Sequence, residues 1–282
     1  MPQIPLDGLN IIKNEPEKPL KKYMKGAEPF FHNANSDIGI LLLHGFTASP
    51  YQFKELREKL AQKNITTYAP VIAGHGTTPE DLMATTIGDW IESAQNAYNF
   101  LKEKSKFIVI IGSSFGGNLA YHLAVKNDDA LKGIVSLGTP VYLRWHRIII
   151  ARTIVYGWMK KFYKKQSANY KPSYTDAPEV VSYPVIPISS LKNLLNFLKY
   201  FTLPGLKNIT TPTLIIQANQ DPVVNPKSAQ HLHQYLGSQH KKVYWMEGNF
   251  HALDEPSKKQ EIFDVIYTFI DEVTKKNGNN NL

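Results

Sequence analysis

The fold is indicated most clearly by the stretch Phe107-Ile-Val-Ile-Ile-Gly-Ser-Ser-Phe-Gly-Gly117. Its first five residues are apolar and four of them are β-branched, which predicts a buried strand. The pattern Gly-x-Ser-x-Gly follows, and Asn118 to Lys126 continues as a helix. A serine in such a strand–turn–helix stands on a sharp turn where bulkier neighbours would clash. We therefore predict that Ser114 is a nucleophile at a helix amino terminus, rather than part of a Gly/Ser-rich turn without chemistry.

Strands and helices alternate on both sides of this stretch. Apolar runs predict strands at 38–43, 65–69, 107–111, 133–137, 213–217 and 242–246, and helical spacing predicts helices at 51–63, 89–104, 118–126, 226–236 and 256–273. Strands that are apolar throughout are typical of a parallel sheet covered on both faces. We predict an α/β fold with a mostly parallel central sheet and helices on both faces. Residues 1–37 read as an irregular arm with one or two edge strands.

Composition excludes several classes of protein. The 282 residues are 43% hydrophobic, which suffices for a sizeable core, and the chain has no cysteine. Disulfide scaffolds, thiolate metal sites and cysteine nucleophiles are therefore excluded. Because there is no secretory segment and no apolar run long enough to span a bilayer, we expect a soluble, cytoplasmic protein.

The segment 141–207 interrupts the alternation and carries the basic character of the chain. It holds eleven of the 32 Lys and Arg residues but only two acids, Asp176 and Glu179, in a protein of net charge +8. Long insertions in α/β folds usually bind or cover a site. We predict one core domain made of 1–140 and 208–282, with 141–207 as an inserted, basic, aromatic cap.

A serine nucleophile needs a base, and the base needs an orienting acid. In this kind of fold they follow the nucleophile in the order acid, then histidine. Asp221 follows the predicted strand 213–217, and His251 follows 242–246. Taken alone, Asp221 is a common turn-forming Asp-Pro, but the joint positions favour Asp221 as the acid and His251 as the base. The backbone N–H groups of Phe115 and Phe46 are the expected oxyanion donors.

These motifs resemble those of an α/β-hydrolase of the bacterial carboxylesterase and monoacylglycerol lipase type. The matching pieces span residues 38 to 251 and are Leu41-Leu-Leu-His-Gly-Phe-Thr47, Gly74-His-Gly-Thr77 with Glu80-Asp81, Asp89-Trp90, Gly112-x-Ser114-x-Gly-Gly117, Asp221-x-Val-Val-x-Pro226 and His251. The resemblance implies ester hydrolysis through an acyl-enzyme without a cofactor. It carries Ser114, Asp221 and His251 over as the triad, and Phe46 and Phe115 as the oxyanion donors. The expected substrate is a small, lipid-like ester with a short to medium acyl chain, or a monoacylglycerol.

Alternatives remain open at this level. An acyl-thioesterase would use the same triad, and a non-catalytic hydrolase-fold protein would use the cap to bind a ligand. No metal, P-loop or dinucleotide motif is present, and no nucleic-acid-binding module accompanies the basic charge. Aromatic and basic residues mingle at 144–165, either as a cap over the site or as a contact with an anionic membrane surface or substrate. His44 and His75 are expected to brace loops, and the oligomeric state is left open.

Overall fold

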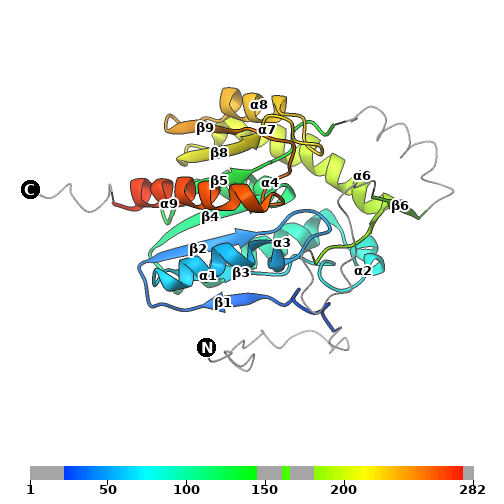
Figure 1. Ribbon diagram of the computed structural model, residues 1–282, viewed down its shortest axis with the longest axis horizontal. Coiled ribbons are helices and arrows are strands. Elements are labelled where there is room, and N and C mark those ends of the chain that lie inside the picture. The colour runs from blue at the N-terminus through cyan, green and yellow to red at the C-terminus, as the bar shows by residue number, and fades with distance from the viewer. Residues whose placement is uncertain (1–21, 145–160, 166–180, 276–282) are drawn as a thin grey trace, which may run out of the picture.

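A seven-stranded sheet forms the centre of the molecule (Figure 1). The computed structural model describes residues 22–144, 161–165 and 181–275. The strands lie in the order β1-β3-β2-β4-β5-β8-β9, and only β1 pairs antiparallel, with β3. Their bounds are β1 Phe30–His32, β2 Ile38–Leu43, β3 Thr66–Ala69, β4 Phe107–Ser113, β5 Leu131–Leu137, β8 Thr213–Ala218 and β9 Lys241–Met246. The prediction of a mostly parallel sheet is confirmed, and β1 is the expected edge strand.

Helices cover both faces of this sheet. Helices α3, α4 and α8 contribute to the core on one face, and α1 and α9 contribute to the core on the other. The helical elements are η2 Pro50–Phe53, α1 Lys54–Gln62, α2 Pro79–Ala84, α3 Ile87–Lys102, α4 Phe115–Ala124, α6 Ile188–Phe197, η3 Leu198–Thr202, α7 Leu203–Gly205, η4 Leu206–Asn208, α8 Lys227–Tyr235, η5 Pro256–Lys258 and α9 Lys259–Lys275.

Strand β2 shows why the strands read as continuous apolar runs. Leu41 and Leu43 pack in the core beneath α3 and α4, while Ile40 and Leu42 pack in the core beneath α1 and α9. All four are 0% exposed. Successive side chains of a strand point to opposite faces, so a strand buried on both faces is apolar at every position.

Two helices differ from the prediction, one because of its cap and one because of its length. Helix α3 begins two residues early because Thr86 and Asp89 form a capping box, in which each side chain accepts the other's backbone N–H. Helix α2 was not predicted, although Thr78 caps it and Pro79 opens it. It has only six residues, too few for a periodic apolar pattern.

The insertion is described in part. Strands β6 (Phe162–Lys164) and β7 (Val185–Pro187) form a small antiparallel ladder, and α6 follows directly. Most of the predicted aromatic and basic stretch, 145–160, lies outside the described residues. Lys161 and Lys164 are exposed, whereas burial lowers the pKa of Lys165 to about 8. Within the described ranges, no helix has the length and hydropathy needed to cross a membrane.

Candidate active site

Ser114 occupies a strained turn between β4 and α4. Its backbone has φ +51° and ψ −118°, in the positive-φ region that side chains other than glycine rarely adopt. An added Cβ at Gly116 would lie 1.9 Å from the Leu43 carbonyl oxygen, and one at Gly112 would lie 2.4 Å from the Gly116 carbonyl oxygen. The glycines are therefore required by close backbone packing. Ser114 is partly exposed between buried neighbours, as a nucleophile must be.

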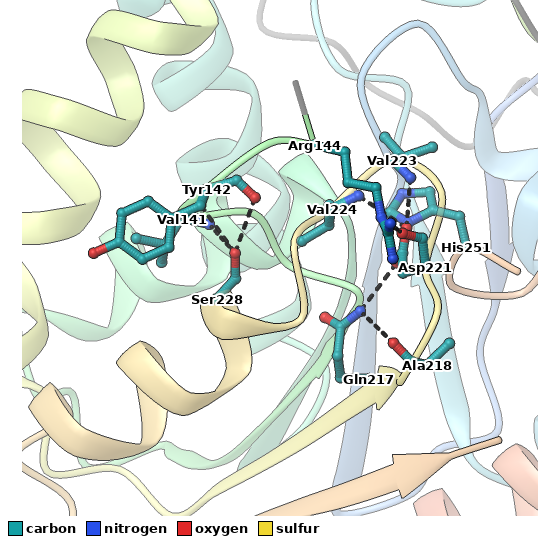
Figure 2. A network of polar contacts seen from close by, with 10 residues as sticks. All are labelled: Val141, Tyr142, Arg144, Gln217, Ala218, Asp221, Val223, Val224, Ser228 and His251. Carbon is teal, nitrogen blue, oxygen red and sulfur yellow. Dashed lines mark hydrogen bonds and ion pairs between the residues drawn. The ribbon is translucent and has the colours of Figure 1, made fainter. Parts of the chain in front are cut away.

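Asp221 and His251 form a buried pair (Figure 2). The His251 Nδ1 lies 2.8 Å from Asp221 Oδ2. The other carboxylate oxygen, Oδ1, accepts the backbone N–H groups of Val223 and Val224, both at 2.8 Å, and Gln217 Nε2 donates to Oδ2 at 3.1 Å. Because a carboxylate only accepts, the proton of the imidazole sits on Nδ1, and Nε2 has a lone pair for a substrate or serine proton.

The turn after β5 brings the pair and the serine together. The Ser114 backbone N–H donates to the Leu137 carbonyl oxygen at 2.7 Å. An added Cβ on the next residue, Gly138, would lie 3.1 Å from the His251 ring and 3.3 Å from Asp221 Oδ2. All three predicted residues therefore surround the carboxyl end of β5, at the edge of the sheet where α/β folds place their sites.

Burial and the neighbouring charges have opposite effects on the pKa of the His251 imidazole. Burial lowers its pKa, but the charge and hydrogen bond of Asp221, together with the charge of Asp254, outweigh burial and raise the pKa above 6.5. The positive charge of Lys165 acts in the opposite direction. The backbone N–H of Asp254 donates to the His251 carbonyl oxygen at 3.0 Å, and burial raises the pKa of the Asp254 carboxyl. The imidazole therefore becomes neutral, and able to act as a base, at a higher pH than an ordinary histidine.

The loop after β2 lies against the serine. An added Cβ at Gly45 would be 3.3 Å from Ser114 Cβ, and the rings of Phe46 and Phe115 meet edge to face at 6.0 Å. The Phe115 N–H is the first of helix α4, where N–H groups have no acceptor within the helix. The two predicted oxyanion donors, Phe46 and Phe115, therefore belong to neighbouring backbone segments beside Ser114.

Histidines brace this region, as predicted. His44 Nε2 accepts the Ile72 N–H at 3.1 Å, so its Nδ1 carries the proton and donates to the Gly45 carbonyl oxygen at 3.0 Å. The His75 Nδ1 lies 3.1 Å from the Ala73 carbonyl oxygen. Burial lowers the pKa of His44 to about 4 and that of His75 to about 3, so both rings are neutral at physiological pH.

The first residues of the insertion support the loop that carries Asp221, and the sequence did not indicate this. Arg144 donates through Nε to the Asp221 carbonyl oxygen and through its backbone N–H to Val223 at 2.9 Å. Ser228 Oγ, at the start of α8, accepts the N–H groups of Val141 and Tyr142 and donates to the Tyr142 carbonyl oxygen (Figure 2). Neither Arg144, in an irregular segment, nor Ser228, at the start of a helix, belongs to a sequence pattern that predicts such partners.

One cavity among the described residues lies away from Ser114. A cavity of about 340 Å³ opens at the amino ends of β5 and β8, between Asp128, Lys132 and His240. It contains none of the candidate residues and lies at the opposite edge of the sheet from Ser114. In the part of the chain that the structure describes, no three His, Asp or Glu side chains are grouped to hold a metal ion.

Residues 34–255 match the family model described as "Serine aminopeptidase, S33". The chain belongs to this family. A thermostable monoacylglycerol lipase of Bacillus sp. (strain H-257) is 32% identical over 229 residues, covering 81% of this chain and 88% of the relative. A carboxylesterase of Bacillus subtilis (strain 168) is 25% identical over 243 residues, covering 84% and 94%. This S33-family chain is accordingly a serine hydrolase that acts on ester bonds, as the motifs predicted.

Solved structures agree with the fold of the S33-family chain. One from work on LipS and LipT, two metagenome-derived lipolytic enzymes, superposes with a TM-score of 0.79 at 27% identity, covering 89% of this chain and 100% of that chain. A monoglyceride lipase from Saccharomyces cerevisiae superposes with a TM-score of 0.70 over 92% of this chain and 96% of that chain. At 14% identity, the second likeness concerns the fold alone. The predicted α/β-hydrolase fold is confirmed.

Proposed function

We propose that the enzyme hydrolyses esters through an acyl-enzyme on Ser114. His251 Nε2 takes the Ser114 hydroxyl proton as Oγ attacks the ester carbonyl carbon, and the tetrahedral intermediate forms. The imidazolium then donates that proton to the departing alkoxide, and the carbonyl re-forms as the acyl-enzyme. Water repeats the sequence with His251 again as base, releasing the acid and the free serine.

Asp221 has two roles in this mechanism. Its hydrogen bond at 2.8 Å fixes the imidazole in the tautomer that leaves Nε2 free, and its charge stabilises the imidazolium. The N–H groups of Phe46 and Phe115 stabilise the negative oxygen of each tetrahedral intermediate. The observation that carries the proposal is the buried Asp221–His251 pair at the same turn that binds the Ser114 backbone.

The proposed substrates are monoacylglycerols or other esters with short to medium acyl chains. The segment 141–207 is proposed to be the cap that covers the acyl group. In support, Phe197 of α6 packs edge to face on Phe115 at 5.2 Å, and Trp90 packs on Phe115 at 5.3 Å. All three rings are buried, so the insertion packs tightly against the residue that follows the nucleophile. The Bacillus relative named as a monoacylglycerol lipase supports the same class.

A turnover panel tests this proposal. Purified wild-type enzyme and Ser114→Ala are assayed on p-nitrophenyl esters of increasing chain length, on monoacylglycerols and on acyl-CoA thioesters. We expect ester hydrolysis by the wild type and a loss of about a million-fold in kcat for Ser114→Ala, as for other triad nucleophiles. Near-normal ester turnover by Ser114→Ala would refute the nucleophile. A kcat/KM highest for acyl-CoA would establish the thioesterase instead.

A further inference from the structure

Tyr183 joins the insertion to two loops of the core. It lies two residues before β7 and is 1% exposed. Its backbone N–H donates to the Thr47 carbonyl oxygen at 2.9 Å. Its hydroxyl donates to the Gly74 carbonyl oxygen and accepts the Thr77 N–H, each at 2.9 Å. A single buried residue therefore connects the insertion, through its backbone N–H, to the loop that carries Phe46 and, through its hydroxyl, to the loop at 74–77.

A second bond reinforces the same connection. Ser49 Oγ, 0% exposed, donates to the Val181 carbonyl oxygen at 2.9 Å. The segment 181–183 is thus tied to the loop after β2 at two points, Thr47 and Ser49, and to the loop at 74–77 by the tyrosine hydroxyl. Buried hydrogen bonds of this kind restrict the relative movement of the segments that they join.

The loop that Tyr183 contacts needs such support. Thr47 has φ +63°, an unfavourable conformation for a β-branched residue. The Gly45 N–H donates to Gln52 Oε1 at 3.1 Å, on the other side of Phe46. Phe46 therefore lies between two fixed points, Gln52 at Gly45 and Tyr183 at Thr47. The peptide that carries the Phe46 N–H is itself held through the Gly45 carbonyl oxygen, which accepts His44 Nδ1 at 3.0 Å and the Ala48 N–H at 3.1 Å. The Gln52 and Tyr183 bonds hold the residues on either side of this peptide.

Ring contacts extend this arrangement to the Phe46 side chain. The Tyr183 ring is nearly parallel to the His75 ring, with an interplanar angle of 12° and centroids 6.5 Å apart. The His75 ring in turn meets Phe46 edge to face at 6.0 Å. The His75 ring is neutral, so it acts here as a packing group between the tyrosine and the phenylalanine.

We propose that Tyr183 is a positioning residue that couples the inserted segment to the oxyanion hole. Its hydroxyl fixes residues 181–183 on the core, and its N–H holds the Thr47 carbonyl, so that the Phe46 N–H faces the reacting oxygen. The inference rests on the proposed function, because it requires Phe46 to be an oxyanion donor. It follows that the Phe46 N–H is correctly placed only while residues 181–183 keep their hydrogen bonds to the core.

Tyr183→Phe tests this, with Tyr200→Phe as the matched control. The variant removes the two hydroxyl bonds but keeps the ring and the backbone bond to Thr47, while Tyr200 is 59% exposed in the same insertion. Loss of a whole oxyanion donor costs about 10²- to 10³-fold in kcat. We expect a displaced donor to cost about 10-fold in kcat, with KM within about twofold of wild type. The affinity for phenylboronic acid, which forms a tetrahedral adduct on the serine, should fall in parallel.

Ser49→Ala is the second variant, and it decides the matter if Tyr183→Phe does not fold. It removes only the bond to Val181, so a smaller loss in kcat with unchanged KM is expected. The inference is overturned if the folded variants keep wild-type kcat and boronate affinity, or if they lose only thermal stability. Activity retained by Ser114→Ala would instead overturn the proposed function. Inactive Ser114→Ala together with a Tyr183→Phe that matches Tyr200→Phe would overturn this inference alone.

Discussion

Replacing Asp221 with Asn changes one atom and should reverse the imidazole tautomer. Both N–H groups at Asp221 Oδ1, from Val223 and Val224, need an acceptor. An asparagine that placed its NH₂ there would create two donor–donor contacts, each costing about 1–3 kcal/mol. The amide oxygen therefore takes the Oδ1 position, and the NH₂ group faces His251. The imidazole Nδ1 must then accept, which moves the proton to Nε2.

With its proton on Nε2, His251 no longer accepts the proton of Ser114. The buried pair gains no water to offset the change, because Asp221 is 0% exposed. An Asp→Asn change that traps the wrong tautomer in a serine-hydrolase triad lowers kcat by about 10⁴-fold, or about 5.5 kcal/mol in activation free energy. We expect a loss of that size for Asp221→Asn, with KM for p-nitrophenyl butyrate within about threefold.

The assay compares two carboxylates near the same histidine. Steady-state hydrolysis of p-nitrophenyl butyrate at pH 8 is measured for Asp221→Asn and for Asp254→Asn, with circular dichroism to confirm folding. Asp254 acts on His251 through its charge and its backbone, so Asp254→Asn should stay within about tenfold of wild type. The reasoning is refuted if Asp221→Asn also stays within tenfold, or if Asp254→Asn is the more damaging change.

The remaining predictions concern pH and the cap. Since catalysis requires neutral His251, kcat/KM should rise with pH through a midpoint above about 6.5. The positive charge of Lys165 lowers the pKa of His251 and the negative charge of Asp254 raises it. Lys165→Met should therefore move the midpoint up, and Asp254→Asn should move it down. Shifts of the same sign in a pH 5–8 profile, where Lys165 is still mostly charged, would contradict this. We also propose that the exposed Lys161 and Lys164 contact anionic lipid. At about 1 kcal/mol per lysine, the double variant Lys161→Gln, Lys164→Gln should bind phosphatidylglycerol vesicles about 30-fold more weakly at low salt. This loss of affinity should shrink as salt is added. Unchanged vesicle binding at low salt would remove the membrane role.

The order of elements could be predicted because the strands are buried on both faces. Apolar runs such as Ile38–Leu43 have no polar alternation to obscure them. The glycines around Ser114 are required because an added Cβ there would come as close as 1.9 Å to a neighbouring atom. The same reasoning placed Asp221 and His251 after β8 and β9. The structure adds a hydrogen bond between them that no spacing in the chain implies.

The supporting residues could not be predicted, for a physical reason. Tyr183 and Arg144 act through backbone atoms of residues far away in the chain, so their partners have no side-chain signature. Asp254 lies just before the predicted helix 256–273, and Lys165 ends the basic and aromatic stretch 144–165. Neither position marks these residues as neighbours of His251. The charges of both residues act on the His251 imidazole, and their proximity to it follows from tertiary packing rather than from sequence pattern.

Covalent labelling shows most directly whether Ser114 is the nucleophile. The enzyme is treated with a fluorophosphonate and, in parallel, quenched with acid during turnover of p-nitrophenyl butyrate, and the peptides are mapped by mass spectrometry. The account predicts one phosphonyl group and one butyryl group, each on Ser114 and each absent from Ser114→Ala. Attachment at another residue, or turnover without any butyryl adduct in rapid-quench samples and without phosphonate inhibition, would contradict it.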